Sequence, residues 1–442
     1  MKLVLVAGLA AASTTLAAPG WIKQIQEAAR KMKFKKVIKH VQEKYPQQWE
    51  KFLELKEQYQ HFYKDDEDLF VHFQHFRENC DLSEFFEAVS NEQHAEFKLE
   101  ETCLNGFFDE SQEEFRQKHL MPNAMNASEY RDNSVKKQLL DGSGNPQYWP
   151  LEIPDWIKAC APTESCGLGS IEFPWECQPA PTSFPSTNYP TDLDWSTDNN
   201  PSGKSVLVDV KDQGICGSCY SFSGISVIES LMIREGYVSN PSSWKGLSEQ
   251  EVINCMDDNR ARFGPFVNHG CNGGWPSNIF LYGTVREHIT GADSHPYTSG
   301  NNRVVGSCFT DGWPVSYGVN SEFTNDFVPG KCFVTKMGDE EQLKKALYHH
   351  GPVAVVMDTS SREFQLYRNG ILDISDCSTT SLNHAMTLVG YGEENGVKYW
   401  KVRNSWGSWW GDDGYFKIVR DGSNACGITS VATYLTTENY YE

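Results

Sequence analysis

Two cysteines three positions apart stand in Gln213-Gly214-Ile215-Cys216-Gly217-Ser218-Cys219-Tyr220-Ser221-Phe222. The apolar residues that follow recur at helical spacing and predict a helix over 218–236 that ends at a glycine. Three interpretations of the pair compete: a disulfide clip, a metal-binding knuckle, and a thiol nucleophile at the N-terminus of a helix. The residues elsewhere in the chain must decide among them.

The gross features of the chain indicate an exported protein with more than one domain. Its 442 residues exceed one ordinary domain, so we expect two, joined by a linker. A formal net charge of -20 argues against nucleic acid as a partner. Lys2, an apolar run over 3–12 and small residues up to Ala18 predict a secretory signal over 1–18. No later stretch reaches ~18 continuous apolar residues, so no membrane span is expected.

The secretory signal has consequences for the cysteines and for one asparagine. The route leads to lysosomes, endosomes or the cell exterior through an oxidising compartment, where most of the 13 cysteines should be paired. The odd count leaves at least one cysteine without an internal partner. Asn126-Ala127-Ser128 is a sequon, which makes Asn126 a candidate for glycosylation.

The region 19–122 is predicted to form a small helical bundle with charged faces. Its aromatic and apolar residues recur at helical spacing and are expected on one buried stripe. They are Trp49, Phe52, Leu53, Tyr59 or Phe62, Phe70, Phe73, Phe76, Phe85 and Phe86. The next segment, 123–187, is rich in Pro, Ser and Asn and indicates a linker. Its Cys160, Cys166 and Cys177 suggest one or two local cross-links, with a metal site as the weaker alternative.

The region 188–442 changes in character from helices to strands. Apolar or alternating runs predict strands over 353–357, 386–389, 399–402 and 415–419. Asn395-Gly396 is a strong two-residue hairpin turn, which pairs the second of these strands with the third. We therefore predict an α+β domain with a helix-rich half followed by an antiparallel β half.

A base and an orienting amide lie at the open end of this hairpin. His384 directly precedes one strand and Asn404 directly follows the strand paired with it, so the two can lie side by side. A thiol becomes a nucleophile when its thiolate is stabilised, and both a helix N-terminus and a nearby imidazolium do this. Cys219 stands at the predicted helix start. The sequence therefore favours the nucleophile interpretation for Cys219.

These motifs, in this order, resemble those of the papain family of cysteine proteases (cathepsin type) over about residues 193–435. The resemblance implies a papain-like fold of two subdomains, with the active-site cleft between them. It implies Cys219 as the nucleophile, His384 as general base and then general acid, and Asn404 as the residue that orients the imidazole. Trp406 would shield that hydrogen bond, and Gln213 would donate to the oxyanion together with the Cys219 backbone N–H.

The same resemblance implies a disulfide framework that leaves Cys219 free, as the chemistry requires. The family-like pairs are Cys216–Cys271, Cys255–Cys308 and Cys377–Cys426. The resemblance gives no pairing for the remaining cysteines, which are Cys80, Cys103, Cys160, Cys166, Cys177 and Cys332. Connectivity does not follow from the sequence alone.

The N-terminal region gains a role from a second resemblance. Cys103-x-Asn105-x-Phe107-x-Asp109 is similar to the Gly-x-Asn-x-Phe-x-Asp motif of the family's pro-regions, with cysteine in place of the glycine. An upstream helix signature is half matched, by Phe76 and Asn79. The resemblance implies an inhibitory propeptide of the cathepsin L/papain type over 19–122, lying along the cleft in the non-productive direction. Protonation of Asp109 and its acidic neighbours is expected to weaken its hold.

Substrate preference follows from the resemblance residue by residue. The positions of the family's main specificity pocket hold only apolar side chains here, so we expect a bulky hydrophobic residue at P2 of the substrate in preference to arginine. The residues expected to bind substrate are Gly273, Gly274, Trp275, Pro276, Val356, Leu382, Ala385, Trp406 and Val431. Besides protein and peptide substrates, cystatin-type inhibitors are expected partners of a monomer that uses no cofactor or metal.

Several features keep other interpretations open. Tyr220 replaces the usual tryptophan, and Cys-Tyr-Ser-Phe resembles the dipeptidyl-peptidase I branch, which is an exopeptidase. The spacing from the cysteine to its partners exceeds the ~130–150 positions of the family, which indicates loop insertions within 256–270 and 309–330. A catalytically inactive binding protein and a thioredoxin-like redox pair are further rivals, and the latter lacks a βαβ context. His349-His350 could suggest a metal but fits a helix C-terminus better.

Overall fold

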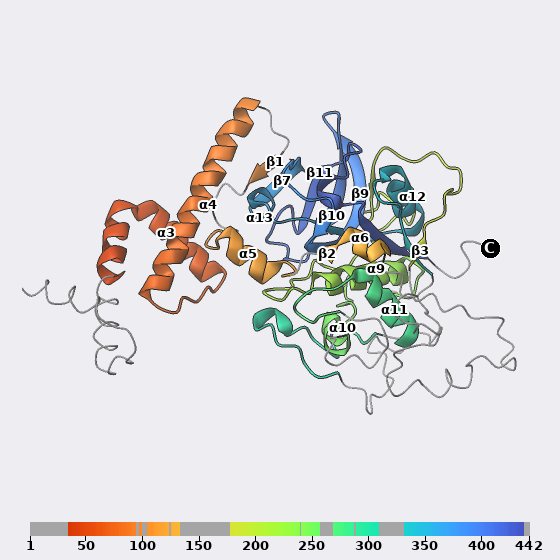
Figure 1. Ribbon diagram of the computed structural model, residues 1–442, viewed down its shortest axis with the longest axis horizontal. Coiled ribbons are helices and arrows are strands. Elements are labelled where there is room, and N and C mark those ends of the chain that lie inside the picture. The colour runs from red at the N-terminus through yellow and green to blue at the C-terminus, as the bar shows by residue number, and fades with distance from the viewer. Residues whose placement is uncertain are drawn as a thin grey trace, which may run out of the picture.

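The computed structural model shows a small helical body at the N-terminus beside a larger body that contains a sheet and helices (Figure 1). It describes residues 34–93, 97–99, 103, 105–122, 125–132, 177–238, 240–256, 268–286, 289–308 and 331–436. The expected signal, Cys160, Cys166 and most of both expected insertions lie outside these residues. No helix within the described ranges is long and apolar enough to cross a membrane.

The larger body is organised around a mixed sheet of ten strands. Hydrogen-bonded neighbours follow the order β1-β7-β11-β10-β9-β6-β12-β5-β3, with β4 paired to β9. A separate two-stranded sheet joins β2 to β8. The strand bounds are β1 Phe97–Leu99, β2 Met125–Asn126, β3 Gln178–Pro179, β4 Leu193–Asp194, β5 Cys332–Val334, β6 Val353–Met357, β7 Tyr367–Leu372, β8 Ser381–Leu382, β9 His384–Glu394, β10 Val397–Arg403, β11 Tyr415–Val419 and β12 Val431–Leu435.

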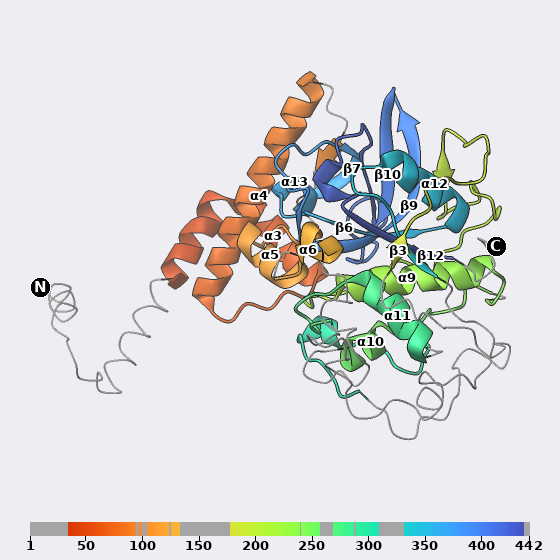
Figure 2. The same ribbon diagram turned by 45° about the vertical axis from the view of Figure 1, so that its right-hand side comes forward.

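A long buried helix, α9, lies between this sheet and two further helices (Figure 2). Every residue of α9 from Cys219 to Ile233 is buried, as a helix with neighbours all round must be. On the sheet side, Ser223 Oγ donates to the backbone oxygen of Met386 at 2.6 Å. On the other side, a Cβ on Gly224 would lie 2.8 Å from Ile279 Cβ, so glycine permits the close approach. The helix bounds in this body are α9 Cys219–Arg234, α10 Glu249–Cys255, α11 Pro276–Arg286, α12 Glu340–His350 and α13 Arg362–Gln365, with 3-10 turns η1 Ser299–Asn301 and η2 Ala425–Gly427.

The hairpin of β9 and β10 forms at the predicted turn. Asn395 and Gly396 both have positive φ, 50° and 86°, as a turn of type I′ requires. His384 is the first residue of β9, and Asn404 directly follows β10. The hairpin therefore brings the two residues to the same end of the sheet.

The small N-terminal body consists of helical residues 34–44, α3 (Pro46–Gln58) and α4 (Asp66–Gln93). One residue of the predicted stripe is wrong: Leu53 is 41% exposed. Of the two alternatives Tyr59 and Phe62, Tyr59 packs against the core of this body, whereas Phe62 is 89% exposed. Leu55 takes the place of Leu53, and Phe62 lies beyond the end of α3, outside its periodicity. The side chains of Phe85 and Phe86 lie outside the described part of the structure. The core of this body contains Val41, Trp49, Phe52, Leu55, Phe73, Phe76, Cys80, Cys103, Phe108 and Leu366.

Both ends of the segment expected as a linker, 123–187, are built into the larger body. At its start, β2 pairs with β8, and α6 (Ala127–Asp132) follows. At its end, β3 pairs in parallel with β5, and the backbone N–H of Ala180 donates to Val334 at 2.8 Å. Residues 133–176 between these ends lie outside the described residues.

The disulfides of the described residues connect distant parts of the chain. The expectation of a local cross-link for Cys177 is wrong, because Cys177 is bonded to Cys332 in β5. A second pair that the sequence left open, Cys80–Cys103, ties α4 to the loop before Asn105. Cys219 is the free cysteine of the described ranges. The three pairs implied by the resemblance are also formed: Cys216–Cys271, Cys255–Cys308 and Cys377–Cys426.

Candidate active site

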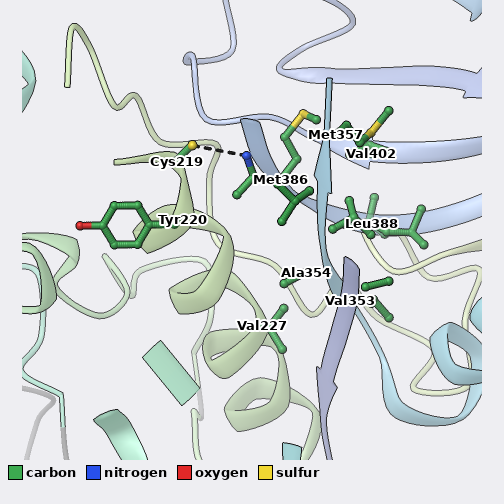
Figure 3. Packing of buried hydrophobic residues seen from close by; sticks show 14 of the residues in the cluster. Cys219, Tyr220, Val227, Val353, Ala354, Met357, Met386, Leu388 and Val402 are labelled. Carbon is green, nitrogen blue, oxygen red and sulfur yellow. Dashed lines mark hydrogen bonds between the residues drawn. The ribbon is translucent and has the colours of Figure 1, made fainter. Parts of the chain in front are cut away.

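Cys219 is the first residue of α9 and is fully buried. Its Sγ accepts a hydrogen bond from the backbone N–H of Ala385 at 3.3 Å, the dashed line in Figure 3. Burial raises the pKa of the Cys219 thiol to about 12, although backbone N–H groups at Ala385 and at the start of α9 lower it. In this covered state the group is a neutral thiol, surrounded by amides that favour a thiolate.

His384 is held by an amide and by an aromatic ring. Its Nε2 lies 2.8 Å from Oδ1 of Asn404, and an amide oxygen only accepts, so Nε2 carries the proton and Nδ1 keeps its lone pair. Oδ1 of Asn404 also accepts from the Ser405 backbone at 2.8 Å, which fixes the amide. The Trp406 ring stacks on the imidazole with 4.7 Å between ring centroids. Burial lowers the pKa of His384 to about 4, so the ring is neutral here.

Gln213 is buried beside the cysteine loop and presents its amide nitrogen to two backbone carbonyls. Nε2 donates to the oxygen of Cys216 at 2.9 Å and to that of His119 at 3.0 Å. Oε1 accepts from Ser405 Oγ at 2.6 Å, which fixes which end of the amide faces the site. A side-chain donor next to a nucleophile is what an oxyanion hole needs. Here the backbone carbonyl of His119, from the N-terminal region, accepts the hydrogen bond of this donor.

A segment of the N-terminal region, residues 105–122 and 125–132, covers the cysteine. Leu120 and Met121 belong to the same buried cluster as Cys219. The backbone N–H of Met121 donates to the oxygen of Asn383 at 2.8 Å, directly before the histidine. The helix of this segment is α5 (Gln112–His119), which begins with a capping box between Ser111 and Glu114. The segment therefore binds through main-chain hydrogen bonds as well as apolar burial.

Aromatic rings anchor the segment on one side of the site. Phe107 lies 5.2 Å from the Trp406 ring and 4.9 Å from the Trp409 ring, both edge to face. Phe115 also meets Trp406 edge to face at 5.2 Å. Tyr59, from the small body, contacts Trp409 at 5.2 Å. Edge-to-face pairs of this kind add to the stabilisation that burial alone provides.

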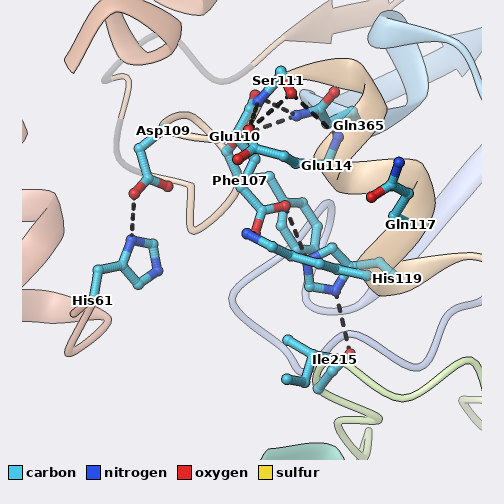
Figure 4. Close-up of polar contacts among 12 residues, drawn as sticks. His61, Phe107, Asp109, Glu110, Ser111, Glu114, Gln117, His119, Ile215 and Gln365 are labelled. Carbon is cyan, nitrogen blue, oxygen red and sulfur yellow. Dashed lines mark hydrogen bonds and ion pairs between the residues drawn. The ribbon is translucent and has the colours of Figure 1, made fainter. Parts of the chain in front are cut away.

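Asp109 connects this segment to the small helical body (Figure 4). Its Oδ2 accepts from the hydroxyl of Tyr63 at 2.7 Å and lies 2.8 Å from Nδ1 of His61. Asn79 of α4 donates to the backbone oxygens on either side of Asp109, at 2.9 and 3.0 Å. Asn105 instead faces the larger body and donates to the Gln365 oxygen at 3.3 Å. The motif residues thus join the two bodies.

Glu110 is buried against two basic side chains of the same segment. Its carboxylate lies 3.0 Å from Nε2 of His119 and 2.9 Å from Nζ of Lys118. Burial by itself would raise the pKa of Glu110, but the charges and hydrogen bonds of His119 and Lys118 outweigh it and lower the pKa to about 2. Nδ1 of His119 lies 3.2 Å from the Gly214 oxygen, so this network reaches the cysteine loop.

The residues expected in the specificity pocket fall into two groups. Val356, Ala385 and Val431 are neighbours across β6, β9 and β12, and all are buried. Leu382 lies in β8, where it pairs with Met125 of the covering segment. Trp275 and Pro276 lie at the start of α11, where the Tyr130 ring of the covering segment contacts Trp275 at 4.6 Å. Of the two glycines, Gly273 faces Met121 and Gly274 faces Asn268.

Three residues of the site were missed by sequence reasoning. The His119 carbonyl accepts a hydrogen bond from the Gln213 amide, and the Tyr130 ring contacts the Trp275 ring. The amide of Gln365 donates to the Phe107 oxygen at 3.1 Å. Each contact joins residues far apart in the chain, and two of the six groups are backbone carbonyls that carry no sequence signal. The capping box at Ser111 and Glu114 was the one local pattern that could have placed a helix just before Leu120. The metal interpretation of the cysteine pair fails, because Cys216 is bonded to Cys271.

Comparison with known proteins covers both bodies. The family model described as papain family cysteine protease matches residues 189–436. A cathepsin L-like peptidase of Aedes aegypti is 36% identical over 250 residues, which are 56% of this chain and 64% of that protein. Digestive cysteine proteinase 1 of Homarus americanus is 34% identical over 259 residues, 58% of this chain and 70% of that protein. The solved structure of digestive procathepsin L2 proteinase from Tenebrio molitor larval midgut has a TM-score of 0.63 at 26% identity, with 88% of this chain and 100% of that chain covered.

Proposed function

Because the chain belongs to the papain family of cysteine proteases, we propose that it is a cysteine endopeptidase made as an inactive zymogen. The observation that carries the proposal is the joint position of three groups. Cys219 begins a buried helix, His384 Nε2 is fixed by Asn404 at 2.8 Å, and the Gln213 amide nitrogen lies beside the cysteine loop. The arrangement provides a nucleophile, an oriented base and an oxyanion donor.

The reaction follows from these positions. His384 accepts the thiol proton of Cys219 at Nδ1, and the thiolate attacks the carbonyl carbon of the scissile peptide bond. Gln213 Nε2 and the Cys219 backbone N–H bind the resulting oxyanion. The bond to nitrogen breaks as His384 gives its proton to the leaving amine, which leaves a thioester on Cys219. A water molecule, deprotonated by His384, then attacks the thioester and restores the thiol as the carboxylic acid leaves.

Latency follows from the covering segment. Contacts run in chain order from Phe107 on Trp406, through Leu120 and Met121 over the cysteine, to Tyr130 on Trp275. The carbonyl of His119 takes the donor that the oxyanion would use. A peptide that crosses the cleft in this chain direction presents no carbonyl to Cys219 in a geometry that allows attack. We propose this non-productive binding for the propeptide, residues 19–122. Burial also favours the uncharged thiol and imidazole over the reactive ion pair.

We expect a bulky hydrophobic P2 residue because the pocket positions Val356, Leu382, Ala385 and Val431 are apolar and buried. A carboxylate would be needed there to pair with arginine. The check is the ratio of kcat/KM for Z-Phe-Arg and Z-Arg-Arg amide substrates with the matured enzyme. The Phe substrate should be cleaved faster, and equal rates would contradict the assignment of the pocket.

The activity is tested by covalent labelling with an epoxide inhibitor such as E-64. The acid-matured native protein should label once per chain, and the variant Cys219→Ser should not label and should lose peptide hydrolysis by roughly 10⁴-fold or more. Ser221→Ala, two positions further along α9, is the matched control for the fold. A matured native protein that neither labels nor cleaves peptides would instead support a role as a binding protein.

An exopeptidase of dipeptidyl-peptidase I type is the second candidate, because of Tyr220. The Tyr220 side chain is buried and its hydroxyl donates to the Gly270 oxygen at 2.9 Å, away from the cysteine sulfur. N-terminal sequencing of the acid-matured enzyme separates the two candidates. A first residue near Tyr189 supports the endopeptidase, whereas retention of a long N-terminal fragment supports the exopeptidase.

The remaining features of the proposal concern the route of the protein and its activation. Five disulfides within the described residues support passage through the secretory pathway, with Asn126 glycosylated and the product a monomer in lysosomes, in endosomes or outside the cell. Cystatin-type inhibitors are proposed partners of the open enzyme. Asp109 joins the two bodies and is proposed to act as an acid sensor. If Asp109→Asn keeps the pH dependence of zymogen conversion, Asp109 is not the sensor.

A further inference from the structure

Three side chains with metal-binding chemistry meet where the small helical body contacts the covering segment. His72 and His75 lie one turn apart on α4, and Glu114 reaches them from α5. Nδ1 of His75 lies 3.1 Å from Oε2 of Glu114, and Nε2 of His72 lies 3.9 Å from Oε1 of the same carboxylate. One ligand atom from each residue falls within 4.8 Å of the others. The active-site residues take no part in this cluster.

The His72 ring is oriented as a metal ligand. Its Nδ1 lies 2.6 Å from the backbone oxygen of Asp109, which can only accept, so Nδ1 is the protonated nitrogen of the neutral ring. The lone pair of Nε2 then faces two carboxylates, Glu114 at 3.9 Å and Asp68 at 3.7 Å. A lone pair facing two carboxylates is unfavourable, and either a proton on Nε2 or a metal cation between the three groups relieves it. A histidine whose second N–H donates to a carbonyl is also the usual outer-shell arrangement of metal-bound imidazoles.

The carboxylate of Glu114 is held in place from the other side. Oε2 accepts from both the backbone N–H and the hydroxyl of Ser111, each at 2.8 Å. The side chains of His72, His75 and Glu114 are 13%, 21% and 31% exposed, so an ion can reach them without unfolding the protein. Asp68, one turn before His72 on α4, could complete a set of four ligands. The cluster is thus partly preorganised and accessible.

We propose that His72, His75 and Glu114 form a Zn²⁺ site that fastens α4 to α5 in the zymogen. Two imidazoles and a carboxylate are ligands that Zn²⁺ accepts in tetrahedral sites, with water or Asp68 in the fourth position. The expectation from the sequence was that the protein uses no metal. The proposed site lies outside the catalytic centre and is lost when the propeptide leaves. A role of this site in regulation rests on the proposed function. A metal that holds α5 in place would preserve the hydrogen bond from the Gln213 amide to the His119 carbonyl at the end of that helix.

The test is metal binding to the full chain carrying Cys219→Ser, which neither processes itself nor offers the thiol as a ligand. Isothermal titration with Zn²⁺ at pH 7 should show one saturable site per chain. Co²⁺ in place of Zn²⁺ should give the visible absorption of a tetrahedral nitrogen and oxygen site. His75→Ala and Glu114→Gln should each weaken binding by at least ~10–100-fold. His40→Ala, an exposed histidine of the same body, should leave it unchanged.

The outcomes separate this proposal from the proposed function. Absence of a saturable Zn²⁺ site, or the same affinity in His75→Ala and Glu114→Gln as in the parent chain, overturns the proposal and leaves an ion-pair cluster only. Glu114→Gln preserves the shape of the side chain, so a loss of binding in that variant with unchanged circular dichroism is not a folding defect. Failure of epoxide labelling would overturn the peptidase and leave the Zn²⁺ result standing.

Discussion

The covering segment and the small helical body belong to one N-terminal region, yet they are held in different ways. Phe107, Phe115, Leu120, Met121 and Ala127 are members of the large core that also contains Cys219. The helices α3 and α4 have a core of their own, to which the larger body contributes Leu366 and the covering segment contributes Phe108. The covering segment is therefore packed mainly as part of the peptidase, whereas the helices form a separate module beside it.

The difference bears on which part of the N-terminal region would cause the proposed latency. The helical module contacts the covering segment through defined groups: the two Asn79 hydrogen bonds, the Asp109 contacts, and the ion pairs of His72 and His75 with Glu114. The Cys80–Cys103 disulfide ties the module to the loop just before the segment. It also connects to the larger body through the short pairing of β1 with β7. We infer that the covering segment blocks the site and that the helical module holds it there. Changes in the segment should therefore affect latency far more than changes on the module's surface.

The largest expected effect is at Phe107. Phe107→Ala removes a ring that is 3% exposed and contacts both Trp406 and Trp409, which should weaken the covered state by about 3–5 kcal/mol. Labelling of the zymogen by the epoxide inhibitor at pH 7 should then be at least ~100-fold faster. Phe62→Ala, at a residue 89% exposed in the helical module, should label like the parent chain. Equal labelling rates in the two variants would remove the distinction between segment and module.

A somewhat smaller effect is expected at Gln213, whose amide has a role both in the matured enzyme and in the zymogen. In the matured enzyme Gln213→Ala should lower kcat by about 10²–10³-fold with little change in KM, because an oxyanion donor acts mainly in the transition state. In the zymogen the same change removes the hydrogen bond to the His119 oxygen. The checks are steady-state kinetics and the labelling rate. The control is Gln342→Ala, because the amide of Gln342 donates to the Pro181 oxygen and not to a residue of the site. An unchanged kcat in Gln213→Ala would exclude Gln213 as the oxyanion donor.

The parts of the site that the sequence could predict depend on local patterns. The turn Asn395-Gly396 sets the hairpin, and the hairpin sets the 2.8 Å contact between His384 and Asn404. The start of α9 at Cys219 follows in the same way from helical spacing. The turn sets the register of the two strands as far as Lys401, which could be predicted without the tertiary fold. The register shift between Lys401 and Val402, which follows it, carries no such local signal.

The parts that the sequence could not predict depend on contacts between distant segments. Leu53 and Leu55 are equally apolar, and only the packing of α3 on α4 decides that Leu55 is buried. Cys103 stands where the pro-region motif has glycine, and its φ of 59° is a left-handed conformation that favours glycine. The disulfide partner that accompanies this replacement, Cys80, is 23 positions away and carries no local signal. The pairing of Cys177 with Cys332 was hidden for the same reason.

The smallest of the three effects concerns acid and the covering segment. Opening the site moves a proton from the Cys219 sulfur to His384 and takes up none, so acid sensitivity must come from other groups. Glu110 is one, because the pKa of its carboxyl is lowered from 4.5 to about 2 in the covered state. Its carboxylate therefore stabilises that state fully above about pH 4.5, and the contribution is lost as the pH falls toward 2.

Glu110→Gln should remove this contribution, about 2 kcal/mol for hydrogen bonds to a charged group. At pH 7 the variant zymogen should be labelled by the epoxide inhibitor roughly 30-fold faster than the parent. The ratio of the two rates should begin to fall below about pH 4.5 and should approach one only below about pH 2, where the parent carries a protonated Glu110 as well. Taking the ratio cancels the pH dependence of the labelling reaction itself. Glu113→Gln, an exposed position on α5, should give a ratio near one throughout. A ratio for Glu110→Gln that stays constant from pH 7 to pH 3 would show that the helical module, and not this carboxylate of the covering segment, supplies the response to acid.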